Sequence, residues 1–276
     1  KPIGILLLLW PTLWGLWLSA LGRPDWLVVG IFVLGTVLMR SAGCVINDLA
    51  DRNFDPHVAR TRNRPLAAGR VSGREALLLF AVLVVCAGLV VLPLRSWLLG
   101  GLCVAALFLA VTYPFTKRFL AVPQAYLGVA FGFGIPMAYA AQLGSVPAEA
   151  WWLLLANVFW AIAYDTEYAM VDRADDLKLG IRTSAITFGR AEVAAVMLCY
   201  ALALGLVGMV GHDLGLGALF YSGLVVAAGI AGYHYTLISG RDPERCFQAF
   251  RHNNWLGASV FAGIALDFLV NRGIAA

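Results

Sequence analysis

Long apolar runs alternate with short polar connections along the whole chain. Reading these runs against charged, glycine and proline breaks predicts nine apolar helices. They cover residues 3–22, 26–46, 75–94, 96–112, 119–141, 150–171, 191–210, 214–239 and 254–271. About 20 apolar helical residues are needed to cross the hydrocarbon core of a bilayer. The pattern therefore predicts an all-α fold, a multi-spanning membrane helical bundle with about nine transmembrane helices.

Composition supports a membrane location and a single domain. The 276 residues are 61% hydrophobic and only 13% charged, and the mean hydropathy of +0.80 lies outside the range of ordinary soluble domains. No Pro/Ser-rich or highly charged linker divides the chain, so we expect one domain over residues 1–276. The chain begins at Lys1, and we expect further residues upstream. The first apolar run is too long for a signal-peptide core, so we expect it to be a retained span.

Basic residues are sorted onto one side of the predicted bundle. All Lys and Arg residues except Arg23, Arg40, Arg95 and Arg272 fall at the N-terminus or in the connections after the second, fourth, sixth and eighth spans. Because cytoplasmic loops are enriched in Lys and Arg, this asymmetry places the N-terminus inside and the C-terminus outside. The net charge of +4 thus has a topological cause, and no nucleic-acid partner is expected.

Two acidic clusters interrupt this apolar chain, NDLADRNFD at 47–55 and YDTEYAMVDRADD at 164–176. An even number of predicted spans separates them, so both emerge on the cytoplasmic side and can face one another. Residues four apart share one helix face. The first stripe comprises Asn47, Asp51 and Asp55, from which Asp48 faces away, and the second comprises Asp165, Tyr168, Asp172 and Asp176.

Converging carboxylates at a membrane-embedded helix end repel one another unless cations lie between them. Hard oxygen ligands of this kind suit Mg²⁺, which is commonly shared with substrate phosphates. The predicted metal ligands are Asn47, Asp51, Asp55, Asp172 and Asp176. The alternative is that these are ordinary polar residues of cytoplasmic loops. A calcium-binding EF-hand loop is excluded, since its third and sixth positions would be Ala50 and Asn53.

Basic and phenolic side chains near these acids predict a diphosphate site. Arg62 and Arg64 lie in RTRNRP, Tyr113 and Lys117 lie in YPFTK, and Lys178 follows the second stripe. Each basic residue taken alone is accounted for as a cytoplasmic anchor. Together with two sets of carboxylates they suggest that the chain binds a diphosphate with Mg²⁺.

These motifs resemble those of the UbiA superfamily of intramembrane prenyltransferases. The family's NDxxDxxxD motif is matched by Asn47, Asp48, Asp51 and Asp55, its DxxYxxxD motif with a further Asp is matched by Asp165, Tyr168, Asp172 and Asp176, and its YxxxK element is matched by Tyr113 and Lys117. The resemblance implies a nine-helix bundle in which Mg²⁺ held by both acidic motifs binds the diphosphate of a polyprenyl donor. It also implies a lateral opening for the lipid tail.

Two further stretches resemble the members of the superfamily that prenylate 4-hydroxybenzoate in ubiquinone synthesis. They are KPIGILLLLWPTLWGLW near the start and CFQAFRHNNWLGASVFAGIALD near the end. The resemblance implies an enzyme of a bacterial inner membrane, whose substrates are polyprenyl diphosphate and 4-hydroxybenzoate. The candidate catalytic residues are Asp48, Asp165 and Tyr168. Either acid could instead be an outer metal ligand. A naphthoate, homogentisate or protohaem acceptor, or a cation-coupled transporter, remains an alternative.

Arg40 is the candidate for binding the carboxylate of the acceptor. A charged residue within a span is costly and usually marks a ligand or a partner. Arg40 lies seven residues before Asn47, about two turns deeper on roughly the same face. The alternatives are a salt bridge to a neighbouring helix and snorkelling toward the interface.

Three expectations concern residues outside the motifs. The four histidines are isolated from one another in sequence, so no role is assigned to them. Gly132, Gly134 and Pro136 predict a kink in the span 119–141. Asn253 and Asn254 open the last predicted span and are expected to cap it, the alternative being that they face the acceptor pocket.

Overall fold

The computed structural model of the chain describes residues 2–53, 55–57 and 61–273. The regular structure of these residues is helical, without β-strands. The longer helices are α1 (Pro2–Ser19), α2 (Trp26–Ala50), α3 (Gly73–Val91), α4 (Trp97–Thr116), α5 (Pro123–Gly132), α6 (Gly134–Leu143), α7 (Ala148–Leu179), α9 (Glu192–Asp213), α10 (Ala218–Ile238) and α11 (Pro243–Gly273). A short helix, α8 (Ser184–Phe188), and 3-10 turns at Asp55–His57, Leu92–Leu94 and Gly189–Ala191 complete the described elements.

Each predicted span corresponds to one of these helices, or to the consecutive pair α5 and α6, so the all-α bundle is confirmed. Six segments of the described chain are long and apolar enough to cross a membrane. They are Trp26–Ala50, Gly73–Leu94, Trp97–Thr116, Pro123–Leu143, Ser184–Asp213 and Pro243–Asn271. The apolar helix α1 is shorter. The helix α7 combines an apolar N-terminal half with the acidic residues of the second motif.

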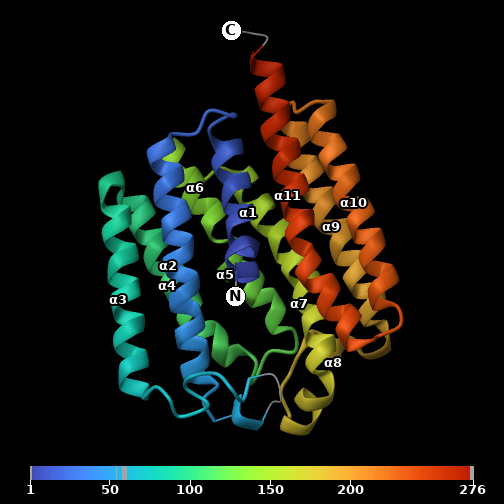
Figure 1. The fold of residues 1–276 in the computed structure, drawn as a ribbon. Helices are drawn as coiled ribbons and strands as arrows, with labels where there is room; N and C mark the ends of the chain where they lie inside the picture. Colours follow the sequence, from blue (N-terminus) through green and yellow to red (C-terminus); the bar gives the residue numbers. More distant parts are fainter. Residues whose placement is uncertain (1, 54, 58–60, 274–276) are drawn as a thin grey trace.

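The helices form two outer groups around a central one (Figure 1). The helices α2, α3 and α4 lie on one side, α9, α10 and α11 lie on the other, and α1, α5, α6 and α7 lie between them. The largest cluster of buried side chains joins α1 to α7, α9, α10 and α11. At its centre Trp14 of α1 stacks on Trp160 of α7, with 5.2 Å between the ring centroids.

The predicted kink in the fifth span is confirmed as a break at Phe133 between α5 and α6. Pro136 has no backbone N–H, so the carbonyl one turn earlier loses its helical donor. Glycines on both sides of the break allow neighbouring helices to approach closely. A Cβ on Gly128 would lie 2.6 Å from the Cα of Val158 on α7, and one on Gly134 would overlap Thr12 on α1. The break therefore lies where three helices meet.

A buried polar network connects α7 to α9, α10 and α11. The Tyr200 hydroxyl donates to Glu167 Oε1 at 2.8 Å, and Asn253 Nδ2 donates to Glu167 Oε2 at 2.8 Å. His234 Nδ1 lies 3.0 Å from the Tyr200 hydroxyl, and His234 Nε2 lies 3.1 Å from His252 Nδ1. His234 and His252 are thus separated in the sequence but in contact in the fold. Asn253 lies inside α11 and does not cap it.

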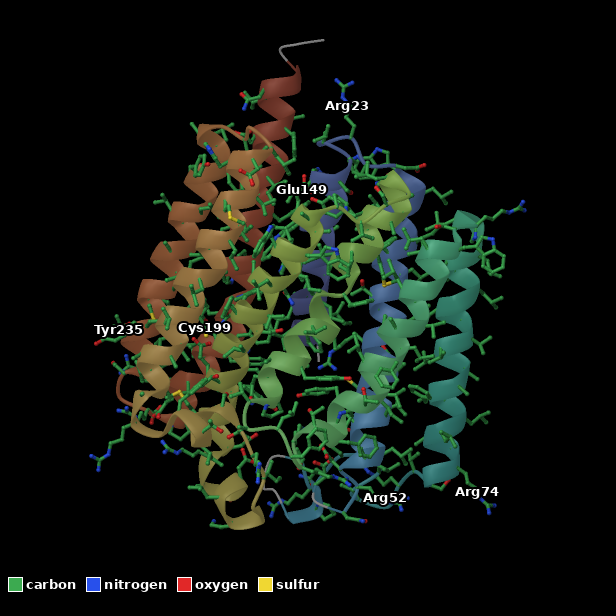
Figure 2. All side chains as sticks on the ribbon, turned by 180° about the vertical axis from the view of Figure 1, so that it is seen from behind. Arg23, Arg52, Arg74, Glu149, Cys199 and Tyr235 are labelled. Carbon is green, nitrogen blue, oxygen red and sulfur yellow. The ribbon has the colours of Figure 1, made fainter. Side chains whose placement is uncertain are left out.

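Charged side chains mark the two ends of the bundle. Arg52 and Arg74 lie at the end that carries the loops after α2, α4 and α7, whereas Arg23 lies at the opposite end with the connection between α1 and α2 (Figure 2). This is the sorting of basic residues that the sequence predicts. Both acidic motifs occur at the end with Arg52 and Arg74, which we call the basic end.

Candidate active site

One cavity of about 1410 Å³ brings the two acidic motifs together. It is lined by the helices α1 to α7 and by the start of α11, and its acidic residues lie at the basic end of the bundle. Most of the candidate residues line it: Arg40, Asn47, Asp48, Asp51, Asp55, Arg64, Tyr113, Lys117, Asp165, Tyr168, Asp172 and Asp176. The inference that the two clusters face one another across an even number of spans agrees with this arrangement.

The first motif lies where α2 ends. The helix runs to Ala50, and the Asp51 backbone N–H donates to the Asn47 carbonyl as the helix terminates. The Asn47 side-chain amide also donates to Asp51 Oδ2 at 3.2 Å, so these two side chains lie together on one face. Asp55 belongs to the following 3-10 turn, where its backbone carbonyl accepts a hydrogen bond from the Thr61 hydroxyl at 2.9 Å. The four-residue spacing of the motif therefore continues past the end of α2, to Asp55.

Two cations neutralise this motif in part. Arg64 Nη1 lies 2.8 Å from Asp48 Oδ1 and 3.0 Å from Asp55 Oδ2, so one guanidinium bridges two carboxylates. Lys117, which follows the last residue of α4, reaches Asp51 Oδ2 at 3.3 Å. Burial raises the pKa of the Asp55 carboxyl above its ordinary value, and the neighbouring Arg64 charge acts in the opposite direction. Asp48, expected to face away from the stripe, lines the same cavity as Asp55.

The second motif lies on a single continuous helix. The helix α7 ends at Gly180, whose φ of 67° is readily adopted by glycine, and the Gly180 N–H donates to the Asp176 carbonyl. One turn or more before this end, Asp172 and Asp176 line the cavity. Deeper in the bundle, the Tyr168 ring packs on Phe250 of α11 with 4.8 Å between centroids. Asp165 lies close enough to Lys117 for their charges to interact.

Arg62 and Lys178 do not line the cavity. The Arg62 side chain is exposed. The Lys178 side chain is 76% exposed and lies 3.4 Å from Asp175 on its own helix. Their role in binding diphosphate stays a prediction, and the structure gives it less support than it gives Arg64 and Lys117.

Arg40 lies deeper in the cavity than the acidic motifs. Its guanidinium packs over the Phe131 ring at 5.3 Å. On another side it approaches Gly4 of α1 so closely that a Cβ there would lie 2.6 Å from Arg40 Nε. This nitrogen is buried and has no hydrogen-bond partner among the described residues. A half-buried arginine whose guanidinium lies between a ring and a neighbouring helix, with a buried donor left unpaired, suits an anionic ligand.

The remainder of the cavity is apolar. Val84 and Val91 of α3 line it, as does Leu107 of α4. Gly35 of α2 and Gly88 of α3 also line it, and a Cβ on either would meet nothing within 4 Å. The helix α3 packs along α2 but has little contact with α4 beyond the turn that joins them. This side of the cavity therefore has room for a long hydrocarbon chain.

Some cavity residues carry no signal in the sequence. Gln124 at the start of α5 is 4% exposed and accepts a hydrogen bond from the Ser184 backbone N–H at 3.0 Å. Arg251 of α11 also lines the cavity. Both occur within stretches without a regular polar pattern, so only the folded chain assigns them to the site.

The donor set fits a divalent cation shared with a phosphate ligand. Among the described residues, no three Asp, Glu, His or Cys side chains gather closely enough to hold a metal ion alone. The cavity nevertheless presents carboxylates from two sides, together with the Asn47 amide. Mg²⁺ prefers oxygen ligands, keeps several waters and is usually bound by one or two carboxylates plus substrate phosphates. Such a site does not need a complete protein cage.

Comparison with known proteins gives one consistent result. Residues 8–256 match the model of the UbiA prenyltransferase family. A protein of Dechloromonas aromatica (strain RCB), named 4-hydroxybenzoate octaprenyltransferase, is 69% identical over 271 residues, which cover 98% of this chain and 92% of the relative. A protein of the same name from Azoarcus sp. (strain BH72) is 68% identical over 270 residues, covering 98% and 94%.

Solved structures share the fold. The apo structure of a UbiA homologue from Aeropyrum pernix K1 matches with a TM-score of 0.84 at 25% identity, over 95% of this chain and 97% of that chain. A UbiA homologue from Archaeoglobus fulgidus, bound to GPP and Mg²⁺, matches with a TM-score of 0.70 at 18% identity, over 96% and 97%. The arrangement of helices described above is therefore shared by proteins of distant sequence.

Proposed function

Because the chain belongs to the UbiA prenyltransferase family, we propose that it transfers a polyprenyl group from polyprenyl diphosphate to 4-hydroxybenzoate, with Mg²⁺, in ubiquinone biosynthesis. The two relatives that are 69% and 68% identical to this chain are named for this acceptor and for an octaprenyl group. The observation that carries the proposal is one cavity of the described chain, in which the acidic motifs lie at one end and apolar helix faces at the other. A lipid diphosphate has the same division between charge and hydrocarbon.

The diphosphate binds at the acidic end in this proposal. Five side chains would hold Mg²⁺ there: Asn47, Asp51, Asp55, Asp172 and Asp176. The Arg64 and Lys117 side chains already lie among these carboxylates and donate to the diphosphate. The Tyr113 hydroxyl adds a donor from the same helix face as Lys117, four residues away.

Charge stabilisation drives the first step. When the allylic C–O bond breaks, negative charge develops on the diphosphate and positive charge spreads over the allyl unit. Bound Mg²⁺ supplies much of the charge that stabilises the leaving diphosphate. Arg64 and Lys117 donate to the same oxygens from fixed positions, so little reorganisation is needed as the charge forms.

The acceptor is attacked at the ring carbon ortho to its hydroxyl. This carbon captures the allyl cation, and loss of the ring proton restores aromaticity. Arg40 binds the carboxylate and thereby orients the ring. Asp48 or Asp165 orients the phenol or accepts a proton, and the Tyr168 ring, packed on Phe250, forms a wall beside the reacting carbon.

Location follows from the same proposal. The chain is an integral membrane protein, and the relatives that are 69% and 68% identical to it come from bacteria. We place it in the inner membrane with the acidic end of the cavity toward the cytoplasm. The excess of Lys and Arg at that end supports this orientation. The polar acceptor then arrives from the cytoplasm, while the donor tail stays in the bilayer.

Transfer by the purified protein tests the proposal. The full chain in detergent, with labelled octaprenyl diphosphate, 4-hydroxybenzoate and Mg²⁺, should form one product whose mass equals the acceptor plus the prenyl group minus one hydrogen. EDTA should stop the reaction and added Mg²⁺ should restore it. Parallel assays with a naphthoate, homogentisate and protohaem provide the comparison. Transfer to one of these and not to 4-hydroxybenzoate would overturn the acceptor.

A further inference from the structure

Glu167 lies within the second acidic motif but points away from the cavity. At 100° per residue, Glu167 is about 200° around α7 from Asp165, whereas Tyr168 and Asp172 lie on the side of Asp165. Accordingly, Asp165 and Tyr168 line the cavity, while the Glu167 side chain is 0% exposed among α9, α10 and α11. The proposed reaction gives this carboxyl group no task. A buried carboxylate is nevertheless costly and persists only where its oxygens are hydrogen-bonded.

One amide of α11 holds α7 at two points. Asn253 Nδ2 donates to Glu167 Oε2 at 2.8 Å, and Asn253 Oδ1 accepts from Trp160 Nε1 at 2.9 Å. Trp160 and Glu167 are seven residues apart, two turns along the same face of α7. A single side chain of α11 therefore bridges two successive positions on this face. Such a bridge resists both rotation of α7 about its axis and sliding along it.

Neighbouring groups complete the arrangement. Tyr200 of α9 contacts both members of the pair, since its hydroxyl lies within hydrogen-bond distance of Glu167 Oε1 at 2.8 Å and of Asn253 Oδ1 at 2.9 Å. The Tyr200 hydroxyl also lies 3.0 Å from His234 Nδ1 of α10. Fully satisfied buried networks of this kind favour one packing arrangement over others. Here the arrangement joins α7 to three helices on the side opposite the cavity.

We propose that the Glu167–Asn253 pair is a positioning device that sets the rotation and height of α7, and thereby directs Asp165 and Tyr168 at the reacting atoms. The inference rests on the proposed function, since it assigns the pair to that reaction. A displacement of about 1 Å in a reacting group costs on the order of a hundredfold in rate. Small rotations of α7 are therefore sufficient to reduce kcat without removing any group that touches the substrates.

A reciprocal exchange of the pair tests this inference. Asn253→Asp places two carboxylates against each other and should lower kcat at least tenfold, with both KM values within about threefold of wild type. The double variant Asn253→Asp with Glu167→Gln restores one donor and one acceptor, because the glutamine amide donates to the new aspartate while its oxygen still accepts from Tyr200. It should recover most of the lost kcat. Assays are run under conditions in which circular dichroism shows that each variant is fully folded.

A matched control is the neighbouring residue on α11. Asn254 Oδ1 accepts from Trp10 Nε1 at 2.9 Å, and an aspartate there keeps that acceptor. Asn254→Asp should keep kcat near the wild-type value, and it should not restore kcat when it is combined with Glu167→Gln. If Asn253→Asp does not fold, Tyr200→Phe replaces it. This variant removes one donor to Glu167 and should lower kcat severalfold with unchanged KM values.

The outcomes separate the two proposals. No transfer to 4-hydroxybenzoate by wild type counts against the proposed function. Normal wild-type transfer, combined with a fully folded Asn253→Asp of wild-type kcat, overturns the positioning role. A double variant as slow as Asn253→Asp also overturns it. Where Tyr200→Phe is tested instead, a wild-type kcat in that variant overturns it.

Discussion

Single carboxylates of the two acidic motifs make the sharpest predictions at the residue scale. Asp51 contacts Lys117 and Asn47, while Asp172 lines the cavity from α7. Asp51→Asn or Asp172→Asn removes a negative charge but keeps the shape of the side chain. Either variant should lower transfer at least about a hundredfold, because fixed charges at the leaving group are removed. Near-normal turnover in a variant that inserts and folds would contradict the assignment of metal ligands.

Arg40 and Gly4 give a paired prediction at the same scale. Arg40→Ala should raise KM for 4-hydroxybenzoate at least about tenfold while KM for the prenyl donor changes little, since a hydrogen bond to a charged group is lost. Gly4→Ala should have the same effect in weaker form, because its Cβ would displace the Arg40 guanidinium. Steady-state kinetics with each substrate varied in turn measure both. Equal effects on the two KM values would remove the assignment of Arg40.

Residue patterns predicted most of the site because its functional side chains recur at the spacing of a helix. Carboxylates four residues apart share a face, so the spacing of Asp51 and Asp55 is informative without a fold. Spacing does not reveal the orientation of the Arg64 side chain, which contacts Asp48, sixteen positions earlier in the sequence. It also does not separate Lys178, which stays at the surface, from Lys117, which enters the cavity. Those differences depend on loop paths and not on helix periodicity.

At the scale of elements, the break between α5 and α6 shows how glycine controls packing. Gly128→Ala should destabilise the protein by about 1–3 kcal/mol, because its Cβ would meet the backbone of Val158, which cannot rotate away. Gly100→Ala on α4 is the control, since a Cβ there meets nothing within 4 Å. Thermal unfolding in detergent should give a lower Tm for the first variant only. Equal Tm values would contradict the close packing of α5 on α7.

Helix existence was predictable and helix ends were not. Apolar runs located each of the longer helices, because a bilayer requires long apolar stretches. It placed the start of the last span at residue 254, whereas α11 begins at Pro243. The Asp242 side chain accepts from the Arg245 N–H at 2.9 Å and fixes this earlier start. Polar residues such as His252 and Asn253 continue the helix because they bond to neighbouring helices, which hydropathy does not register.

The whole molecule has an orientation that labelling can test. Arg23 and Arg74 are both exposed and lie at opposite ends of the bundle (Figure 2). In intact cells, Arg23→Cys should react with a membrane-impermeant maleimide. Arg74→Cys should react only after the cells are permeabilised, which exposes the cytoplasmic face. The parent protein is the control, because its five cysteines are buried or half-buried. The reverse pattern would invert the predicted topology.

The shape of the cavity was beyond prediction for a physical reason. Each lining helix is apolar on several sides, so its sequence does not show whether a face meets lipid, another helix or a ligand. The weak contact between α3 and α4 emerges only from the tertiary packing. The polar end of the same cavity was predictable, because charged residues are costly within a membrane and are kept there mainly for ligands, ions or charged partners.

The bridge from Arg64 to Asp48 and Asp55 has a thermodynamic consequence. In the proposed site Arg64 and a divalent cation compete for Asp55, so the cation would displace an internal counter-ion from this carboxylate. A diphosphate offers Arg64 a new anion and frees this carboxylate at the same moment. The two ligands therefore bind with positive coupling, and linkage requires each to strengthen the other by one common factor. Neither metal nor lipid substrate needs to bind tightly alone for the pair to be held firmly together.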